Sequence, residues 1–367
     1  MAENQTTYDA EQSRRQFRRF FYIALGLHVP LFIYPILRLG DWLAWPLWLT
    51  LIVLVPVAGS QIISRFYLRG RTGLLEKGFR QMADIVLGVS PILFMSLIAF
   101  EVLVLAFAIS VEVAAWSVVT VTFFAGVIGS VIAMTPMVKR FHLTSPRLKA
   151  PVRFVQITDV HIGSRNKAFL DRVIARVNRE KPDFLCITGD FIDATGVPES
   201  DLISLKSVVG PIYFCIGNHE KYEDVEDILK RLENLGVNVL IDRAMHYRDD
   251  IQIIGIDDKE DPLQVEKQLE HIALDEDAFK VLLYHRPRGL EAACEKQIEL
   301  TLSGHTHNGQ IFPFNIAVGQ VFNRIKGMYQ IGEARQYVSQ GTGTWGPTMR
   351  LGTLSEITVF EYEPENH

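Results

Sequence analysis

The sequence predicts an α/β domain that follows a bundle of membrane-spanning helices, and two observations lead to this prediction. Residues 1–150 contain four long apolar runs, whereas the rest of the chain alternates short strand-like runs with amphipathic helical stretches. Short polar clusters rich in Asp, His and Asn follow several of the strand-like runs. A chain of 367 residues is long for one core and suits two domains.

The four apolar runs each approach the roughly 20 residues that a helix needs to cross the hydrocarbon. They are about Phe20–Leu37, Trp42–Ile63, Ile85–Ile109 and Val113–Val138. We therefore assign residues 1–19 to a cytoplasmic N-terminal segment, 20–138 to four transmembrane helices, 139–150 to a basic linker and 151–367 to the α/β domain.

The two parts of the chain differ in charge. Residues 1–150 carry 14 Lys and Arg against 8 Asp and Glu, and the remainder carries 23 Lys and Arg against 34 Asp and Glu. An acidic α/β domain argues against nucleic acid as its main ligand.

Basic residues alternate between the loops that flank the apolar runs. They cluster before the first run, between the second and third, and after the fourth, while the intervening loops hold only Arg38. This pattern predicts that the N-terminus and the α/β domain both lie in the cytoplasm. Ser13-Arg14-Arg15 also resembles a twin-arginine export motif, so export of the domain stays an alternative.

Three acidic residues lie in or beside the apolar runs, where charge is costly and tends to serve a function. Asp84 and Glu112 lie at the ends of runs, where they can reach water. Glu101 is a single residue without an evident cationic partner in the sequence. We therefore expect the runs to form an anchor rather than a transporter.

From residue 152 onward, strand and helix patterns alternate. Runs rich in β-branched and aromatic residues predict strands, and helical spacing predicts helices over Ala168–Arg179 and Leu263–Ile272. The predicted strands are Val152–Thr158, Phe184–Thr188, Ile212–Ile216, Ile251–Ile256, Lys280–Tyr284, Leu300–Ser303, Gln336–Gln340 and Glu356–Tyr362. The initial βαβαβ order places polar loops at the carboxyl ends of strands, where open α/β sheets bind their ligands.

Five polar clusters follow these strands. They are Asp159-Val160-His161, Gly189-Asp190-Phe191-Ile192-Asp193, Gly217-Asn218-His219-Glu220, His285 and Gly304-His305-Thr306-His307. Carboxylate, imidazole and amide ligands suit two adjacent divalent metal ions rather than a thiolate site. One such cluster alone is usually turn chemistry. Five in succession predict a dinuclear phosphoesterase.

In this order the five clusters resemble the calcineurin-like metallophosphoesterase family, over about Pro151–Tyr362. Together with the apolar first part, the chain is similar to the membrane-bound bacterial members, such as UDP-2,3-diacylglucosamine pyrophosphatase-like phosphoesterases. The resemblance implies an α/β (α+β) fold of four layers, in which two facing mixed sheets form a β-sandwich flanked by helices. It also implies a multi-pass protein of the bacterial inner membrane.

The resemblance further implies two divalent metal ions, with manganese as the first expectation and iron, zinc or magnesium as alternatives. Asp190 would bridge the two ions. The other ligands would be Asp159, His161 and His307 for one ion, and Asn218, His285 and His305 for the other. His219 would donate a proton to the leaving oxygen or stabilise the transition-state charge. Asp193 and Glu220 would accept ring N–H bonds from the ligand imidazoles.

The motifs leave the substrate open among phosphodiesters, pyrophosphates and monoesters. We expect membrane lipids as partners and a phosphorylated lipid, a lipid-linked nucleotide or another small phosphoester as substrate; the oligomeric state stays open. The apolar segment Ile311–Val318 would line an acyl-chain groove, contact the bilayer, or form a core hairpin of the second sheet. A non-catalytic membrane scaffold is the alternative from another class. The complete ligand set and His219 favour an enzyme.

Overall fold

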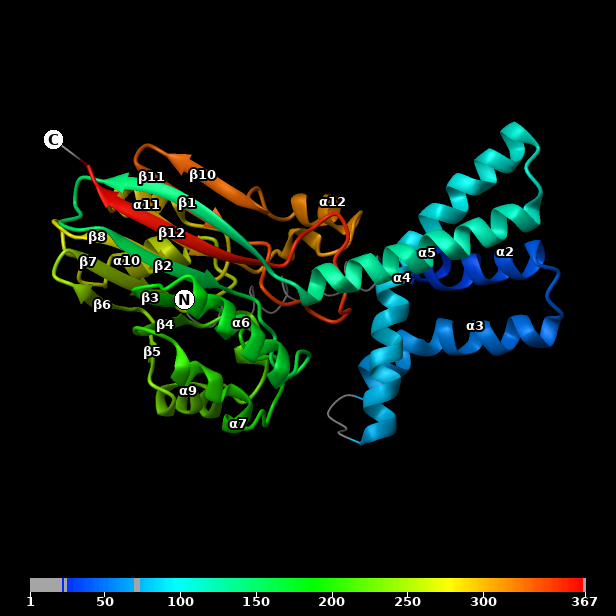
Figure 1. Ribbon diagram of the computed structural model, residues 1–367, viewed down its shortest axis with the longest axis horizontal. Coiled ribbons are helices and arrows are strands. Elements are labelled where there is room, and N and C mark those ends of the chain that lie inside the picture. The colour runs from blue at the N-terminus through cyan, green and yellow to red at the C-terminus, as the bar shows by residue number, and fades with distance from the viewer. Residues whose placement is uncertain (1–21, 23–24, 69–72, 366–367) are drawn as a thin grey trace, which may run out of the picture. The chain divides into compact units, whose positions relative to one another are not determined.

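The computed structural model describes Tyr22, residues 25–68 and residues 73–365 (Figure 1). The chain divides into two compact units, Met1–Ile128 and Gly129–His367. The first is the N-terminal unit and the second the C-terminal unit.

The described part of the N-terminal unit is helical. Its elements are η1 (Val29–Ile33), α2 (Tyr34–Trp42), α3 (Leu47–Ile62), η2 (Ile63–Tyr67), α4 (Leu74–Phe107) and the larger part of α5 (Val111–Met134). Within the described residues, three helical segments are long and apolar enough to cross a membrane, namely Leu47–Tyr67, Leu74–Phe107 and Val111–Met134. The first of the four predicted spans begins outside the described residues, so the number of four stays a prediction.

Glu101 has a cationic partner, contrary to the expectation from sequence. Arg38 Nε lies 2.6 Å from Glu101 Oε1, and the Tyr34 hydroxyl donates to the same oxygen at 2.6 Å. Arg38 stands on α2, 63 residues before Glu101 on α4, and no local pattern reveals a pair so far apart. The ion pair joins the two helices and removes the unpaired charge, which agrees with an anchor.

The C-terminal unit contains two six-stranded mixed sheets. The first has the order β1-β12-β2-β3-β4-β5 and the second the order β10-β11-β9-β8-β7-β6. The strands of the first sheet are β1 (Met137–Ser145), β2 (Val152–Ile157), β3 (Phe184–Thr188), β4 (Ile212–Cys215), β5 (Val237–Val239) and β12 (Glu356–Pro364). Those of the second are β6 (Arg243–Arg248), β7 (Ile251–Gly255), β8 (Phe279–Leu283), β9 (Leu300–Ser303), β10 (Gly327–Ile331) and β11 (Ala334–Val338).

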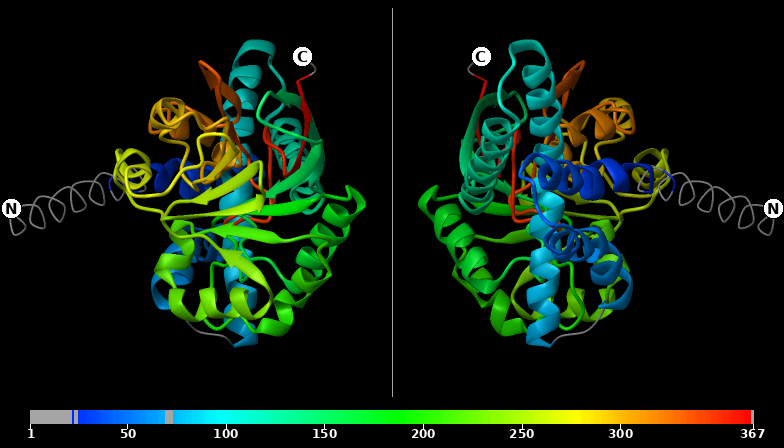
Figure 2. Two further views of the ribbon diagram at one scale, coloured as in Figure 1. Left: turned by 90° about the vertical axis from the view of Figure 1, so that its left-hand side faces the viewer. Right: turned by 90° about the vertical axis from the view of Figure 1, so that its right-hand side faces the viewer.

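Helices cover the outer faces of both sheets and complete four layers (Figure 2). They are α6 (Lys167–Arg179), α7 (Glu199–Leu202), η3 (Ile203–Ser207) and α9 (Val225–Asn234) on the first sheet, and α10 (Gln264–Leu269) and α11 (Leu290–Glu295) on the second. The short helices α8 (Asn218–Tyr222), η4 (His307–Gly309) and α12 (Phe314–Gly319) lie in the segments that follow β4 and β9. Between the sheets, Phe154 stacks on Phe184 with ring centroids 4.8 Å apart. The four-layer α/β sandwich predicted from the family resemblance is thus confirmed.

The helix α6 shows why these residues form these elements. Phe169, Leu170, Val173 and Val177 recur at helical spacing and are buried against the first sheet. The Asn166 side chain caps the helix by accepting a hydrogen bond from the Phe169 N–H at 3.0 Å. The loops at the carboxyl ends of β2, β3 and β4 are thereby held at one edge of the sheet.

Residues 139–150 are mostly strand, so the prediction of a basic linker is wrong there. The helix α5 ends at Met134, and β1 pairs in parallel with β12 from Met137 to Ser145. Phe141 and Leu143 pack against the core between the sheets. Basic residues on the exposed side of β1 obscure the alternation of buried and exposed side chains that is typical of a strand. For the same reason the fourth predicted span, which ends at Val138, extends too far and includes the first residues of β1.

Candidate metal centre

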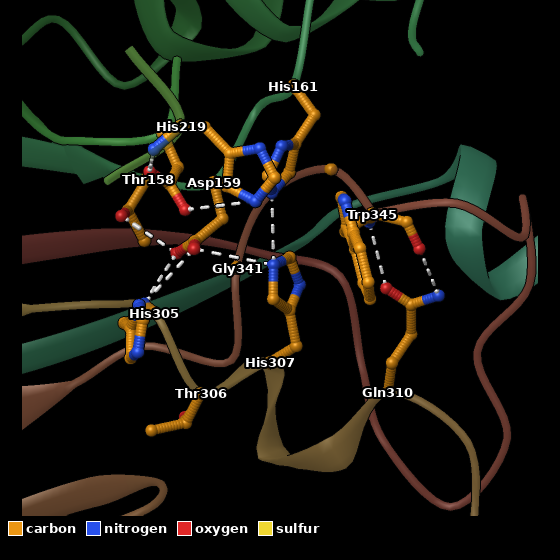
Figure 3. A network of polar contacts seen from close by, with 12 residues as sticks. Thr158, Asp159, His161, His219, His305, Thr306, His307, Gln310, Gly341 and Trp345 are labelled. Atoms are coloured by element: carbon orange, nitrogen blue, oxygen red, sulfur yellow. Dashed lines mark hydrogen bonds and ion pairs between the residues drawn. The ribbon is translucent and has the colours of Figure 1, made fainter. Parts of the chain in front are cut away.

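The predicted ligands lie where strands β2, β3, β8 and β9 end, together with the first residue of α8. Figure 3 shows four of them, Asp159, His161, His305 and His307. Among the described residues, three groups of three side chains each place ligand atoms within 4.8 Å of one another. Two consist of predicted ligands, namely Asp159, His161 and His307 as the first group and Asp190, His285 and His305 as the second. The remaining one, His161 with Asp193 and His219, shares His161 with the first group. The structure therefore brings together six of the seven residues proposed as ligands, in the division that the resemblance implies, with Asp190 in the second group.

In the first group, two imidazoles face each other beside a carboxylate. His161 Nε2 lies 3.1 Å from His307 Nε2, which lies 3.4 Å from Asp159 Oδ1. All three residues are buried. Burial holds the pKa of His307 well below its usual range, so this imidazole is neutral and has a lone pair for a cation.

The second group is oriented by the main chain. His285 Nδ1 lies 2.8 Å from the Thr188 carbonyl oxygen and can donate to it, which leaves Nε2 free to bind a metal. That Nε2 lies 3.1 Å from Asp190 Oδ2 and 3.2 Å from His305 Nδ1. Burial also holds the pKa of His305 well below its usual range.

Asn218, the seventh predicted ligand, lies at the start of α8 and is 9% exposed. Its Oδ1 is buried and has no hydrogen-bond partner among the described residues. A buried carbonyl oxygen without a donor is costly unless something binds it, and a cation would satisfy it. The donor set and this orphaned oxygen fit divalent metal ions.

Two glycines allow the ligands to approach. A Cβ on Gly304 would lie 2.2 Å from Asp159 Oδ2, and a Cβ on Gly217 would lie 2.2 Å from Asp190 Oδ1. Hence the strings Gly-His-x-His and Gly-Asn-His both begin with the one residue that leaves room for the carboxylate.

His219 lies beside both groups. Its Nε2 is 3.9 Å from Asp190 Oδ2, and its ring centroid is 4.8 Å from that of His161. Its N–H donates to Asp190 Oδ1 at 2.8 Å. Burial lowers the pKa of His219. The side chain of His219 is 21% exposed, so it can contact a substrate, whereas the predicted ligands other than His305 are buried.

The two supporting acids have different places. Asp193 Oδ2 lies 3.3 Å from His161 Nδ1, as expected for a carboxylate that fixes an imidazole. Within the described part of the chain, Glu220 makes no hydrogen bond to an imidazole and instead accepts hydrogen bonds from four backbone N–H groups, those of Gly217, Asp190, Phe191 and Ile192, at 2.6 to 3.1 Å. Its predicted role is therefore wrong. Its fully buried side chain ties the loop after β3 to the start of α8.

Arg350 belongs to the site but carries no signal in the sequence. Its side chain is fully buried and donates to the carbonyl oxygens of His307, Gln340 and Gly343 at 3.2, 2.5 and 2.8 Å. Its Nη2, which donates to Gln340 and Gly343, also lies 3.1 Å from His307 Nδ1. Burial lowers its pKa to about 9, so it stays charged at neutral pH. An arginine in a loop rich in Gly, Thr and Pro has no recognisable spacing from the ligand that it supports.

Apolar side chains are exposed on the segment that follows His307. Phe312, Ile316 and Val321, which we name the apolar rim, are 41%, 58% and 68% exposed. None of the residues of α12 is buried, so the alternative of a core hairpin is wrong. Next to the rim, the ring of Phe322 lies 5.2 Å from that of His305. The rim thus borders the metal centre.

Comparisons with known proteins agree with this geometry. Residues 152–309 match the family of calcineurin-like phosphoesterases. The chain is 34% identical over 237 residues to an uncharacterized metallophosphoesterase of Campylobacter jejuni, covering 62% of this chain and 63% of the relative. It is 33% identical over 257 residues to a bovine transmembrane protein with metallophosphoesterase domain, covering 62% of this chain and 56% of the relative. The matches thus span less than two thirds of these relatives' own length.

Among solved structures, the fold is similar to that of a phosphopantetheinyl hydrolase from Mycobacterium tuberculosis, with 13% sequence identity and a TM-score of 0.35. The similarity covers 55% of this chain and 92% of that one.

Proposed function

We propose that this chain, whose residues 152–309 match the family of calcineurin-like phosphoesterases, is a membrane-bound, metal-dependent hydrolase of phosphodiester or pyrophosphate bonds. The observation that carries the proposal is the pair of adjacent His and Asp groups, with the unpaired Asn218 oxygen beside them. Two bound divalent ions would supply Lewis acidity toward a phosphoryl oxygen and a hydroxide at neutral pH. Manganese is the first choice, with iron, zinc or magnesium as alternatives.

Different residues would bind the metal ions and assist the leaving group. Asp159, His161 and His307 would hold one ion, and Asn218, His285 and His305 the other, with the Asp190 carboxylate between them. His219, partly exposed at the edge of the cluster, is placed to give a proton to the leaving oxygen or to stabilise the charge of the transition state.

We further propose an amphiphilic substrate, namely a phosphorylated lipid or a lipid-linked nucleotide. Two features support it. The described residues include three helical segments apolar enough to cross a membrane, and the apolar rim borders the metal centre. Exposed side chains of this kind favour contact with acyl chains over contact with water. UDP-2,3-diacylglucosamine is the specific candidate, because its pyrophosphate joins a nucleotide to a diacylated sugar.

For the location we propose a bacterial inner membrane with the C-terminal unit on the cytoplasmic side. The support is the alternation of basic flanks along residues 1–150. Labelling of single cysteines by a membrane-impermeant reagent in intact cells tests it. Labelling of an introduced Ser207→Cys before lysis would contradict the cytoplasmic side and favour export.

The test of function uses detergent-solubilised full-length protein with Mn²⁺. UDP-2,3-diacylglucosamine is compared with bis-p-nitrophenyl phosphate, and Asp190→Ala serves as the control. Fast release of UMP that is lost in Asp190→Ala is expected. Hydrolysis of the soluble diester alone would retain the phosphoesterase and reject this lipid, and no hydrolysis of either would favour the non-catalytic scaffold.

A further inference from the structure

Two exposed aromatic side chains from distant parts of the chain flank His219. Tyr222, at the end of α8, is 65% exposed, and its ring centroid lies 5.9 Å from that of His219 at an interplanar angle of 71°. Trp345, in the loop between β11 and β12, is 49% exposed, and its ring centroid lies 6.0 Å away at 60°. We name Tyr222 and Trp345 the aromatic pair. Both sit at the candidate proton donor.

Trp345 is held in place by its backbone (Figure 3). Its N–H donates to Gln310 Oε1 at 3.0 Å, and Gln310 Nε2 donates to the carbonyl oxygens of Trp345 and Pro347, both at 3.0 Å. Gln310 is itself only 8% exposed and follows His307 by three residues. The segment that carries the metal ligand therefore also fixes the backbone from which the indole ring projects.

The position of His219 decides which part of a substrate meets this pair. A group that protonates the leaving oxygen lies on the side of the phosphorus from which the leaving group departs. Any leaving group that His219 serves must then lie against the side chains that surround His219. Those with exposed rings are Tyr222 and Trp345.

The apolar rim and the aromatic pair differ in chemistry. The apolar rim offers aliphatic side chains and Phe312, which suit hydrocarbon chains. The aromatic pair offers exposed π faces, on which flat rings stack. We propose that Tyr222 and Trp345 form the leaving-group subsite and that it takes a planar ring such as a nucleobase. This inference rests on the proposed phosphoesterase function and assigns the ring-bearing part of a lipid-linked nucleotide to the aromatic pair and its acyl-bearing part to the apolar rim.

The test measures binding, so that it does not depend on turnover. Calorimetric titration of the Mn²⁺-loaded full-length protein compares UMP with ribose 5-phosphate, which carries the same phosphate and sugar without the base. We expect UMP to bind wild type about 5- to 100-fold more tightly, the range given by base stacking on aromatic side chains. Trp345→Ala should remove most of this preference, Tyr222→Ala part of it, and Trp345→Phe little.

The matched control is Trp116→Ala, because Trp116 is 57% exposed but lies on α5 in the N-terminal unit. It should leave the preference unchanged. A second measurement uses fluorescence, because Trp345 is the one tryptophan of the sequence after residue 128. We expect UMP to quench the tryptophan fluorescence of wild type and not that of Trp345→Phe, which would show that UMP binds next to the Trp345 ring.

Equal binding of UMP and ribose 5-phosphate by wild type, or a preference that survives Trp345→Ala, would overturn the inference. In the latter case Trp345 would serve another purpose, such as contact with the bilayer. Failure of the phosphoesterase function is distinguishable, since it would appear as absent hydrolysis in the assay with the Asp190→Ala control, whatever the preference for the ring.

Discussion

Five predicted metal ligands stand on left-handed backbone, a conformation that costs an L-residue of this kind on the order of 1 kcal/mol. The ligands and their φ angles are Asp159 (53°), His161 (58°), Asp190 (49°), His305 (72°) and His307 (48°). Residues in such conformations persist only where the surroundings hold them, and they gather at functional sites. Here the holding groups include the Glu220 carboxylate and the Arg350 guanidinium.

The close approach of Gly304 to Asp159 leaves no room for a side chain at residue 304. Gly304→Ala should greatly reduce metal binding, because the new Cβ would lie 2.2 Å from Asp159 Oδ2 and displace the carboxylate. Metal content measured by plasma mass spectrometry checks it. The control is Gly319→Ala on α12, where no atom lies within 4 Å of an added Cβ. Full metal content in Gly304→Ala would show that Asp159 is not a necessary ligand.

His219 gives a second prediction. His219→Ala should lower turnover by about 10²- to 10⁴-fold, the usual contribution of a positioned acid, while both metal ions stay bound. Steady-state rates and metal content, measured on the same preparation, separate this outcome from loss of the metals. Unchanged turnover would reject the role of His219.

The sequence could predict the ligands because each stands directly after a strand-like run and belongs to a recognisable string. The supporting residues are different. Gln310 and Arg350 act through backbone carbonyls and N–H groups of segments distant in sequence, which no local pattern encodes. The sequence indicates Glu220 as a supporting residue but predicts imidazole partners for it, whereas its partners are backbone N–H groups. A carboxylate next to a histidine in sequence need not face it in space.

Among the secondary structure elements, the strand β1 joins the end of helix α5 to the first sheet. It pairs with β12 over nine residues, and Phe141 stacks on Phe360 with centroids 5.5 Å apart and meets Tyr337 edge-on at 5.1 Å. Within the C-terminal unit, the Arg350 N–H donates to the Gly129 carbonyl oxygen of α5 at 2.9 Å. The end of the helix is thus fixed to the loop that supports His307.

Phe141→Ala should therefore destabilise the C-terminal unit, by about 2 to 3 kcal/mol for a partly buried aromatic ring. Its neighbour His142 serves as the control, since its side chain is 76% exposed and lies 2.7 Å from a Glu361 carboxylate oxygen. His142→Ala should change the unfolding free energy little. Urea unfolding followed by near-UV circular dichroism compares them. Equal effects would show that β1 does not pack as a strand of the sheet.

Asp250 links β7 to the segment after β1 and gives a prediction about pH. Burial opposes its charge, but hydrogen bonds from Arg248 and from the Lys149 N–H, the latter at 2.7 Å, hold the pKa of Asp250 below 3.8. The carboxylate then contributes stability that is present above pH 3.8 and is lost as the pH falls through the folded pKa.

Asp250→Asn should consequently unfold more easily than wild type at pH 7, by about 1 to 3 kcal/mol, and the difference should shrink toward pH 3. Denaturant titrations at pH 7, 5 and 3.5 measure it. Asp249→Asn, a change at the exposed neighbouring residue, should show no such trend. A difference that does not depend on pH would contradict the assignment of the effect to the charge.

Prediction of elements succeeded for strands buried on both faces and failed for others. Phe184–Thr188 and Leu300–Ser303 were predicted with their observed bounds, since continuous apolar runs bounded by Gly and polar residues leave little choice. The strands β5, β6 and β10 were missed. They are short, or carry exposed polar side chains, and their strand conformation comes from pairing with β4, β7 and β11.

For the whole molecule, the metal ions should contribute to stability as well as to chemistry. Ions that bind only the folded state stabilise it by about 2.7 kcal/mol at a free concentration of 100 Kd. Chelation by EDTA should therefore lower the midpoint of thermal unfolding of the C-terminal unit by roughly 5 to 10 °C, and Mn²⁺ should restore it. Scanning calorimetry checks it. Asp190→Ala should respond less, and an unaltered wild-type midpoint would indicate that no metal stabilises the fold.

The division into an apolar helical part and an α/β part was predictable from the sequence because each medium demands its own residue pattern. The boundary between them was not. Residues 137–145 carry both the charges of a flank and the alternation of a strand, and only the pairing with residues 356–364 decides between the two.

That pairing also has a consequence for biosynthesis. The strand β1 has β12 as its neighbour in the sheet, and β12 is made about 220 residues later. At 5 to 20 residues per second, the ribosome needs roughly 10 to 45 s to reach it. During this interval β1 extends from a finished helix with its edge uncovered, and the nascent domain presents an open sheet to chaperones and neighbouring chains. The order of translation thus makes residues 356–364 the step that closes the fold.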